Sequence, residues 1–310
     1  MLEPVVVGEQ DLELRLALGS ATDVGGREQN EDAIFAGDLT SASGSVSQGD
    51  AVRLVAVADG MGGYQRGEVA SAIAVEALRN ALAETDLSDP AAALKQAFRR
   101  ANQAIFADSA ANGASEAMGT TLVAVLLRGK YATVANVGDS RAYLVRADRL
   151  TQITKDHSLV EEEVDQGALT PEQAERSPHR NILTHALGHR ERLDGKMPNI
   201  FEITLLPEDR LLLCSDGFHG VVPDADMVGV MLTSEPAQAA RRLVSMAVER
   251  GTTDNVSAVV VEARPTRVSV IVSTDLARAA TGRSSYLIPA LVSLGAVLFI
   301  VLVILALTLL

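Results

Sequence analysis

Short apolar runs that end at an aspartate recur along this chain, and they constrain its fold more than any other feature. The first is the run at residues 53–57, which leads into Ala58, Asp59, Gly60, Met61, Gly62 and Gly63. Its length and β-branched residues predict a buried strand. The glycines would let the backbone bend tightly, so that the Gly60 carbonyl lies beside the Asp59 carboxylate. Such oxygen ligands suit Mg²⁺ or Mn²⁺, although an Asp-Gly turn between strands explains the same residues without a ligand.

Four other aspartates also lie next to an apolar run. Asp216 follows the apolar residues 211–214, Asp139 follows 134–138, Asp254 precedes 256–261, and Asp32 adjoins an apolar run. Acids at the strand ends of one sheet system would converge at one edge, where they repel and lose solvation unless a cation neutralises them. A two-metal cluster would solve this problem and could activate a bridging water for in-line attack on phosphorus. For each aspartate alone, a turn or helix-cap role remains the alternative.

The order of the predicted elements indicates an α+β fold with an antiparallel core. Helices are predicted at residues 66–83, from Pro90 onward, and at 236–250. Strands are predicted at 12–21, 53–59, 120–128, 131–137, 142–146, 201–205, 210–214 and 256–263. Tight turns between the strands of residues 120–146 favour an antiparallel meander. Residues 22–32 are predicted to form a loop or strand end, and residues 158–188 a polar surface insertion with helical pieces.

Charge and composition exclude several classes of function. A net charge of −13 argues against nucleic acid as a partner, because nucleic-acid binding needs basic patches. The single cysteine, Cys214, cannot form an internal disulfide, and it lacks the arginine six positions later that a cysteine phosphatase requires. No glycine-rich stretch ends in Gly-Lys-Ser or Gly-Lys-Thr, so a nucleotide-binding P-loop is not expected.

The C-terminal residues 287–310 contain no charged side chain. As a helix they would extend about 36 Å at 1.5 Å per residue, enough to cross a hydrocarbon core of about 30 Å. This pattern predicts a transmembrane helix at 287–310 and a juxtamembrane linker at 265–286, which leaves a folded domain at 12–264 and an N-terminal extension at 1–11. Arginines precede the predicted span, at positions 264, 267, 278 and 283. The positive-inside rule then predicts a single-pass protein of the cell membrane whose domain at 12–264, the catalytic domain if the chain is an enzyme, faces the cytoplasm.

Six segments stand in the order seen in bacterial PP2C-type (PPM) protein phosphatases, and together they give the chain a strong resemblance to that family. They are residues 22–32 (TDVGGREQNED), 59–63 (DGMGG), 118–121 (MGTT), 138–143 (GDSRAY), 215–217 (SDG) and 254–257 (DNVS). The resemblance covers residues 12–263. It implies a four-layer αββα sandwich, in which two antiparallel β-sheets are flanked by helix pairs. It also implies Mn²⁺- or Mg²⁺-dependent hydrolysis of phosphoserine and phosphothreonine on proteins.

The resemblance also implies a role for each residue of the motifs. Asp59 would bridge two metals, the Gly60 carbonyl would bind one of them, and Asp216 and Asp254 would complete the first metal's shell. Asp139 would help to hold a third, weaker metal.

Around these ligands, Glu31 and Asp32 would orient metal-bound waters, and Asn255 would support them. Arg27 would grip the phosphate, a role that suits a guanidinium because its fork matches phosphate oxygens.

Two positions depart from the family pattern. Met61 stands where eukaryotic relatives carry a histidine thought to protonate the leaving group, so the general acid is unassigned. His185 stands where relatives usually have arginine, in a region that matches the family's flap, so substrate preference is open there.

These observations predict a membrane-anchored serine/threonine phosphatase. Its expected partners are phosphorylated proteins and a serine/threonine kinase that it opposes. Nucleic acid and nucleotide are not expected partners. Two alternatives remain. One is a catalytically silent, membrane-tethered module that binds phosphoproteins, and the other is a metal-dependent hydrolase of small phosphate esters.

Overall fold

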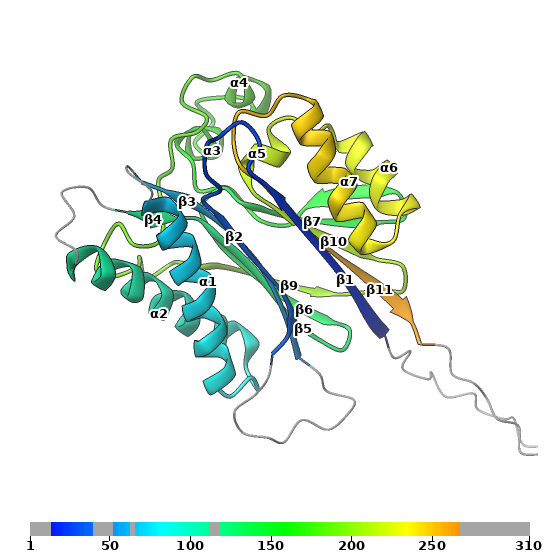
Figure 1. The fold of residues 1–310 in the computed structure, drawn as a ribbon, viewed down its shortest axis with the longest axis horizontal. Coiled ribbons are helices and arrows are strands. Elements are labelled where there is room, and N and C mark those ends of the chain that lie inside the picture. The colour runs from blue at the N-terminus through cyan, green and yellow to red at the C-terminus, as the bar shows by residue number, and fades with distance from the viewer. Residues whose placement is uncertain (1–13, 40–51, 63–65, 112–117, 267–310) are drawn as a thin grey trace, which may run out of the picture. The chain divides into compact units, whose positions relative to one another are not determined.

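The strands form two antiparallel sheets that pack face to face in a computed structural model, which describes residues 14–39, 52–62, 66–111 and 118–266 (Figure 1). Sheet A has the order β1-β11-β10-β7-β8 and contains β1 (Leu14–Asp23), β11 (Val256–Pro265), β10 (Arg210–Cys214), β7 (Arg141–Arg146) and β8 (Arg149–Gln152). Sheet B has the order β2-β3-β5-β6-β9 and contains β2 (Asp32–Asp38), β3 (Val52–Met61), β5 (Leu122–Arg128), β6 (Tyr131–Val137) and β9 (Asn199–Thr204). The short β4 (Gly119–Thr120) pairs with the end of β3.

Helices cover the outer face of each sheet. Helices α1 (Arg66–Glu84) and α2 (Pro90–Ala111) pack on sheet B, whereas α6 (Asp224–Thr233) and α7 (Pro236–Glu249) pack on sheet A. Three shorter helices, α3 (Leu159–Asp165), α4 (Pro171–Glu175) and α5 (Asp216–His219), lie in the connections. Three buried clusters of apolar side chains fill the spaces between helices and sheet B, between the two sheets, and between sheet A and its helices. The predicted α+β fold with two antiparallel sheets and flanking helices is confirmed.

Strand β3 shows why its apolar run is continuous rather than alternating. Leu54 and Ala56 point into the core beneath α1 and α2, whereas Val55 and Val57 point into the core between the sheets. All four are fully buried. Burial of one such aliphatic side chain stabilises the fold by about 1.5–3 kcal/mol, so both faces of the strand hold layers together.

The Asp59 segment differs from the predicted glycine turn. Strand β3 continues through Met61, which places Asp59 and Gly60 inside a strand. The cause is pairing on both sides: Gly60 is in register with Thr120 of β4, and its N–H donates to the Glu31 carbonyl at 3.1 Å. Glycine is needed because of close packing rather than a bend, since a Cβ at Gly60 would lie 2.1 Å from the Gly67 carbonyl oxygen at the start of α1.

Among the described residues, no helix combines the length and apolar character needed to cross a bilayer. The predicted span at 287–310 lies outside the described residues, as do the predicted extension at 1–11, linker residues 267–286 and Gly63. The described residues belong to one unit, Met1–Thr266.

Candidate functional site

Five aspartates meet at one end of the two sheets. Asp32 at the start of β2 lies directly opposite Asp59 in the β2–β3 register. Asp216 follows β10, Asp254 precedes β11 and Asp139 follows β6. The negative charges of the other four all act on Asp59, so the acids share one region of space. The structure therefore brings the predicted acids together, but it draws them from two sheets rather than one.

The buried carboxylates destabilise one another's ionised forms. Burial and then repulsion from Asp216 raise the pKa of Asp59 well above its ordinary value. Burial and repulsion from Asp216 and Asp156 raise the pKa of Asp139 to about 7. The pKa of Asp32 rises to about 6, again first through burial, and that of Asp216 is also raised. A cluster of this kind is stable in its ionised form only beside a cation.

Two observations show that the donor set fits divalent cations. Asp32 Oδ1 and Asp216 Oδ1 are buried oxygens with no hydrogen-bond partner, although buried polar atoms are nearly always paired. In addition, the Arg27 guanidinium donates to Asp254 Oδ2 at 2.6 Å, so a side-chain cation neutralises this acid. Carboxylate and carbonyl oxygens are the ligands that Mg²⁺ and Mn²⁺ prefer.

Within the part of the chain that the structure describes, no three His, Cys, Asp or Glu side chains are drawn close enough to hold a metal as they stand. The electrostatics and the unpaired oxygens, rather than a closed ligand cage, carry the case for a cation here.

Hydroxyl groups with no predicted role hold the Asp32 carboxylate and the Asp59 backbone in place. Ser215 Oγ donates to Asp32 Oδ2 at 2.8 Å and accepts the Ser257 N–H at 3.0 Å. Thr121 Oγ1 accepts the Asp59 N–H at 3.0 Å and lies 2.7 Å from Ser140 Oγ. Ser215 shares a short motif with Asp216, and Ser140 shares one with Asp139, which is the signal that could have identified them.

Asn255 holds the loop that carries Arg27. Its Oδ1 accepts the Glu31 N–H at 2.9 Å, and its Nδ2 donates to the carbonyls of Val24 and Gln29, each at 2.8 Å. Because Asn255 is almost fully buried, these bonds fix both ends of the loop against β11. Asn255 thus positions Arg27 and Glu31.

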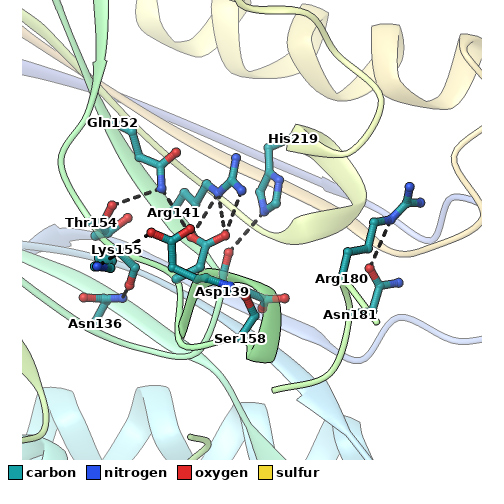
Figure 2. A network of polar contacts seen from close by, with 12 residues as sticks. Asn136, Asp139, Arg141, Gln152, Thr154, Lys155, Ser158, Arg180, Asn181 and His219 are labelled. Carbon is teal, nitrogen blue, oxygen red and sulfur yellow. Dashed lines mark hydrogen bonds and ion pairs between the residues drawn. The ribbon is translucent and has the colours of Figure 1, made fainter. Parts of the chain in front are cut away.

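The turn that carries Asp139 is braced from several sides (Figure 2). The Asp139 carbonyl lies 3.1 Å from His219 Nε2, and the Gly138 N–H donates to His157 Nδ1 at 3.0 Å. Burial lowers the pKa of His157 to about 4, so this ring is neutral at ordinary pH. The His185 ring packs edge-on against His157 with centroids 5.5 Å apart. His185 therefore contacts His157, the residue that accepts a hydrogen bond from the turn carrying Asp139.

Comparisons with known proteins agree with this architecture. The family model described as Protein phosphatase 2C matches residues 17–163. The chain is 38% identical over 237 residues to the serine/threonine protein phosphatase PstP of Mycobacterium tuberculosis, covering 76% of this chain and 42% of PstP. It is 37% identical over 215 residues to the serine/threonine phosphatase stp of Listeria innocua, covering 67% of this chain and 84% of that relative.

A similar solved structure is the catalytic domain of PstP in complex with two manganese ions. It has a TM-score of 0.67 and 37% sequence identity, and the match covers 82% of this chain and 99% of that domain. The chain thus matches the whole solved catalytic domain but less than half the length of PstP itself.

Proposed function

The chain belongs to the protein phosphatase 2C family, and we propose that it is a metal-dependent phosphatase that removes phosphate from phosphoserine and phosphothreonine in proteins. The observation that carries the proposal is the cluster of desolvated aspartates, with two unpaired buried oxygens, beside the Arg27 guanidinium.

Two Mn²⁺ or Mg²⁺ ions fit the oxygen ligands of this cluster. Asp59 and the Gly60 carbonyl would hold them from sheet B, and Asp216 and Asp254 from sheet A. Asp139 would contribute to a third, weaker ion. When bound, these ions supply Lewis acidity and favour a water nucleophile for attack on phosphorus.

The chain's own groups bind the phosphate and orient the nucleophile. Arg27 is 53% exposed, so its guanidinium can leave Asp254 for an incoming phosphate, which its fork binds with two parallel hydrogen bonds. Ser215 fixes Asp32 through Oδ2 and leaves Oδ1 to accept a hydrogen bond from the attacking water. Met61 carries no transferable proton, so it does not protonate the leaving group.

The proposal extends to location. An uncharged segment at 287–310, preceded by arginines, supports anchoring in the cell membrane with the catalytic domain in the cytoplasm, where it would oppose a serine/threonine kinase. Deletion of residues 287–310 should move the protein from the membrane fraction to the soluble fraction. Retention of the truncated protein in carbonate-washed membranes would contradict the anchor.

Activity is tested with the full chain purified in detergent. We expect phosphate release from a phosphothreonine peptide with Mn²⁺ or Mg²⁺, no release with excess EDTA, and strong loss of activity in Asp254→Asn. Turnover that survives both EDTA and Asp254→Asn would refute the metal mechanism. Peptide binding without turnover under all metal conditions would favour a silent binding module, and faster turnover of phosphorylated metabolites than of phosphopeptides would favour a small-ester hydrolase.

A further inference from the structure

The distribution of lysine in this acidic protein is uneven. The chain has a net charge of −13 and four lysines, at positions 95, 130, 155 and 196. Three of the four, Lys95, Lys155 and Lys196, line one open surface pocket of about 320 Å³. The remaining lining is Pro198, Asn199, Ile200 and Phe201. A protein with so few lysines thus places most of them around a single hollow.

Two of these lysines have no polar partner for their side chains within the described residues. Lys95 on α2 and Lys196 before β9 are exposed, and neither side chain has an ion pair or hydrogen bond to the described part of the chain. Lys155 pairs with Asp165 and lies 3.8 Å from Glu161. The positive charges of Lys95 and Lys196 therefore lack a carboxylate partner among the described residues, so the pocket favours an anionic occupant.

The pocket lies at the same end of sheet B as the aspartates. Its residue Asn199 is in register with Asn136, which precedes Asp139 by three residues at the end of β6. The Asn136 side chain donates to the Lys155 carbonyl at 2.9 Å, and Figure 2 labels both residues together with Asp139 in one network of polar contacts. An extended peptide advances about 3.3 Å per residue, so a segment whose phosphorylated residue is at the aspartates can reach the pocket within a short stretch.

The shape of the pocket suits an extended segment. Strand β9 is an edge strand of sheet B, paired only with β6 among the described strands. Its start contributes Asn199, Ile200 and Phe201 to the lining, so apolar and backbone groups lie beside the lysines. A peptide with spaced carboxylates matches this combination better than a compact anion does.

We propose that the pocket of Lys95, Lys155 and Lys196 binds acidic residues that flank the phosphorylated residue of a substrate protein. The inference rests on the proposed phosphatase function and assigns it a substrate class: phosphoproteins with glutamate or aspartate near the phosphosite. Because the rest of the protein is strongly acidic and repels such substrates, this local positive region also sets the register in which they bind.

The test compares three substrates of the full chain with Mn²⁺: a phosphothreonine peptide with glutamates on both sides, the same peptide with glutamines, and p-nitrophenyl phosphate. We expect Lys95→Glu/Lys196→Glu to lower kcat/KM for the acidic peptide about five- to tenfold, as expected for two exposed ion pairs, and to change the other two substrates less than about twofold. The preference of the wild type for the acidic peptide should shrink at high salt. Lys130→Glu is the matched control, because Lys130 lies at the β5–β6 turn at the other end of sheet B.

Each outcome decides between the two proposals. If the wild type hydrolyses both peptides and the double variant lowers them equally or not at all, the pocket assignment is wrong and the phosphatase function stands. If the wild type hydrolyses none of the three substrates, the proposed function fails and the inference fails with it. An equal loss of the acidic preference in Lys130→Glu would assign the effect to overall charge and refute the pocket.

Discussion

Arg27 connects the acids to the substrate, because its guanidinium neutralises Asp254 at 2.6 Å and is half exposed. We expect Arg27→Ala to lower kcat/KM about 10- to 100-fold, since a hydrogen bond to a charged group contributes about 1.5–3 kcal/mol. Arg27→Lys should recover only part of this, because an ammonium lacks the planar fork. Steady-state kinetics with a phosphopeptide measures the effect.

The exposed Arg15 on β1 provides the matched control, and Arg15→Ala should leave kcat/KM unchanged. Arg27→Ala should also lower the Mn²⁺ concentration needed for half-maximal binding, measured by calorimetry, because Asp254 no longer has a competing cation. Unchanged kinetics in Arg27→Ala would contradict the phosphate-binding role.

The buried acids predict an unusual pH dependence of stability for the metal-free protein. The pKa of Asp32 rises to about 6 and that of Asp139 to about 7, above the ordinary 3.8 of an aspartate. The folded state therefore holds more protons than the unfolded state between about pH 4 and pH 7, so stability falls as pH rises through this window. In EDTA the melting temperature should decrease from pH 5 to pH 8, and Asp139→Asn should flatten the decrease. A melting temperature that rises over this range would contradict the assignment.

At the scale of elements, strand β3 and the start of α1 are in close backbone contact at Gly60. A Cβ at Gly60 would lie 2.1 Å from the Gly67 carbonyl, and neither backbone can move without shifting an element. We expect Gly60→Ala to destabilise the protein by about 2 kcal/mol or more and to lower the melting temperature by about 5 °C or more. Thermal denaturation followed by circular dichroism measures this.

Gly229, exposed on α6 with nothing within 4 Å of a built Cβ, offers a matched control. Gly229→Ala should raise the free energy of unfolding by up to about 1 kcal/mol, because alanine is the better helix former. Equal effects of the two substitutions would refute the close-packing account of Gly60.

The sequence predicted those elements whose pattern is strong and missed those set by tertiary pairing. Helices α1, α2 and α7 and strands β5, β6 and β10 fall close to the predicted ranges. Strand β8, with the polar sequence RLTQ, has no apolar alternation and exists because it pairs with β7. Strand β2 corresponds to the apolar run beside Asp32, for which no strand bounds were predicted because only four apolar residues separate Asp32 from Gly37; its pairing with β3 sets the bounds.

The candidate site was predictable as a set of residues but not as an arrangement. Each aspartate adjoins an apolar run, which indicates a strand end. Which sheet each strand joins depends on pairings between distant segments, such as β1 with β11, that no local pattern encodes. For the same reason Ser215 and Thr121 had no predicted role: their partners, Asp32 and Asp59, are far away in the sequence.

At the scale of the whole molecule, cations at this site would join the two sheets, because Asp59 belongs to sheet B and Asp216 follows a strand of sheet A. Mn²⁺ should therefore stabilise the entire domain. At 100 times its dissociation constant, a ligand of the folded state adds about 2.7 kcal/mol, which corresponds to about 5–10 °C in melting temperature for a domain of this size.

Compared with the wild type, Asp216→Asn should have a higher melting temperature in EDTA and a lower one in saturating Mn²⁺. In EDTA the variant loses a buried charge that repels Asp59 and Asp139, so its melting temperature should exceed that of the wild type. In saturating Mn²⁺ the variant lacks a ligand, so the wild type should be the more stable of the two.

Differential scanning calorimetry of both proteins in both conditions tests the crossing. A variant that is less stable than the wild type in EDTA would show that Asp216 serves folding, and equal gains from Mn²⁺ would show that Asp216 does not bind the ion. A crossing would mean that the chain gives up stability in its metal-free form to hold a cation between its two sheets.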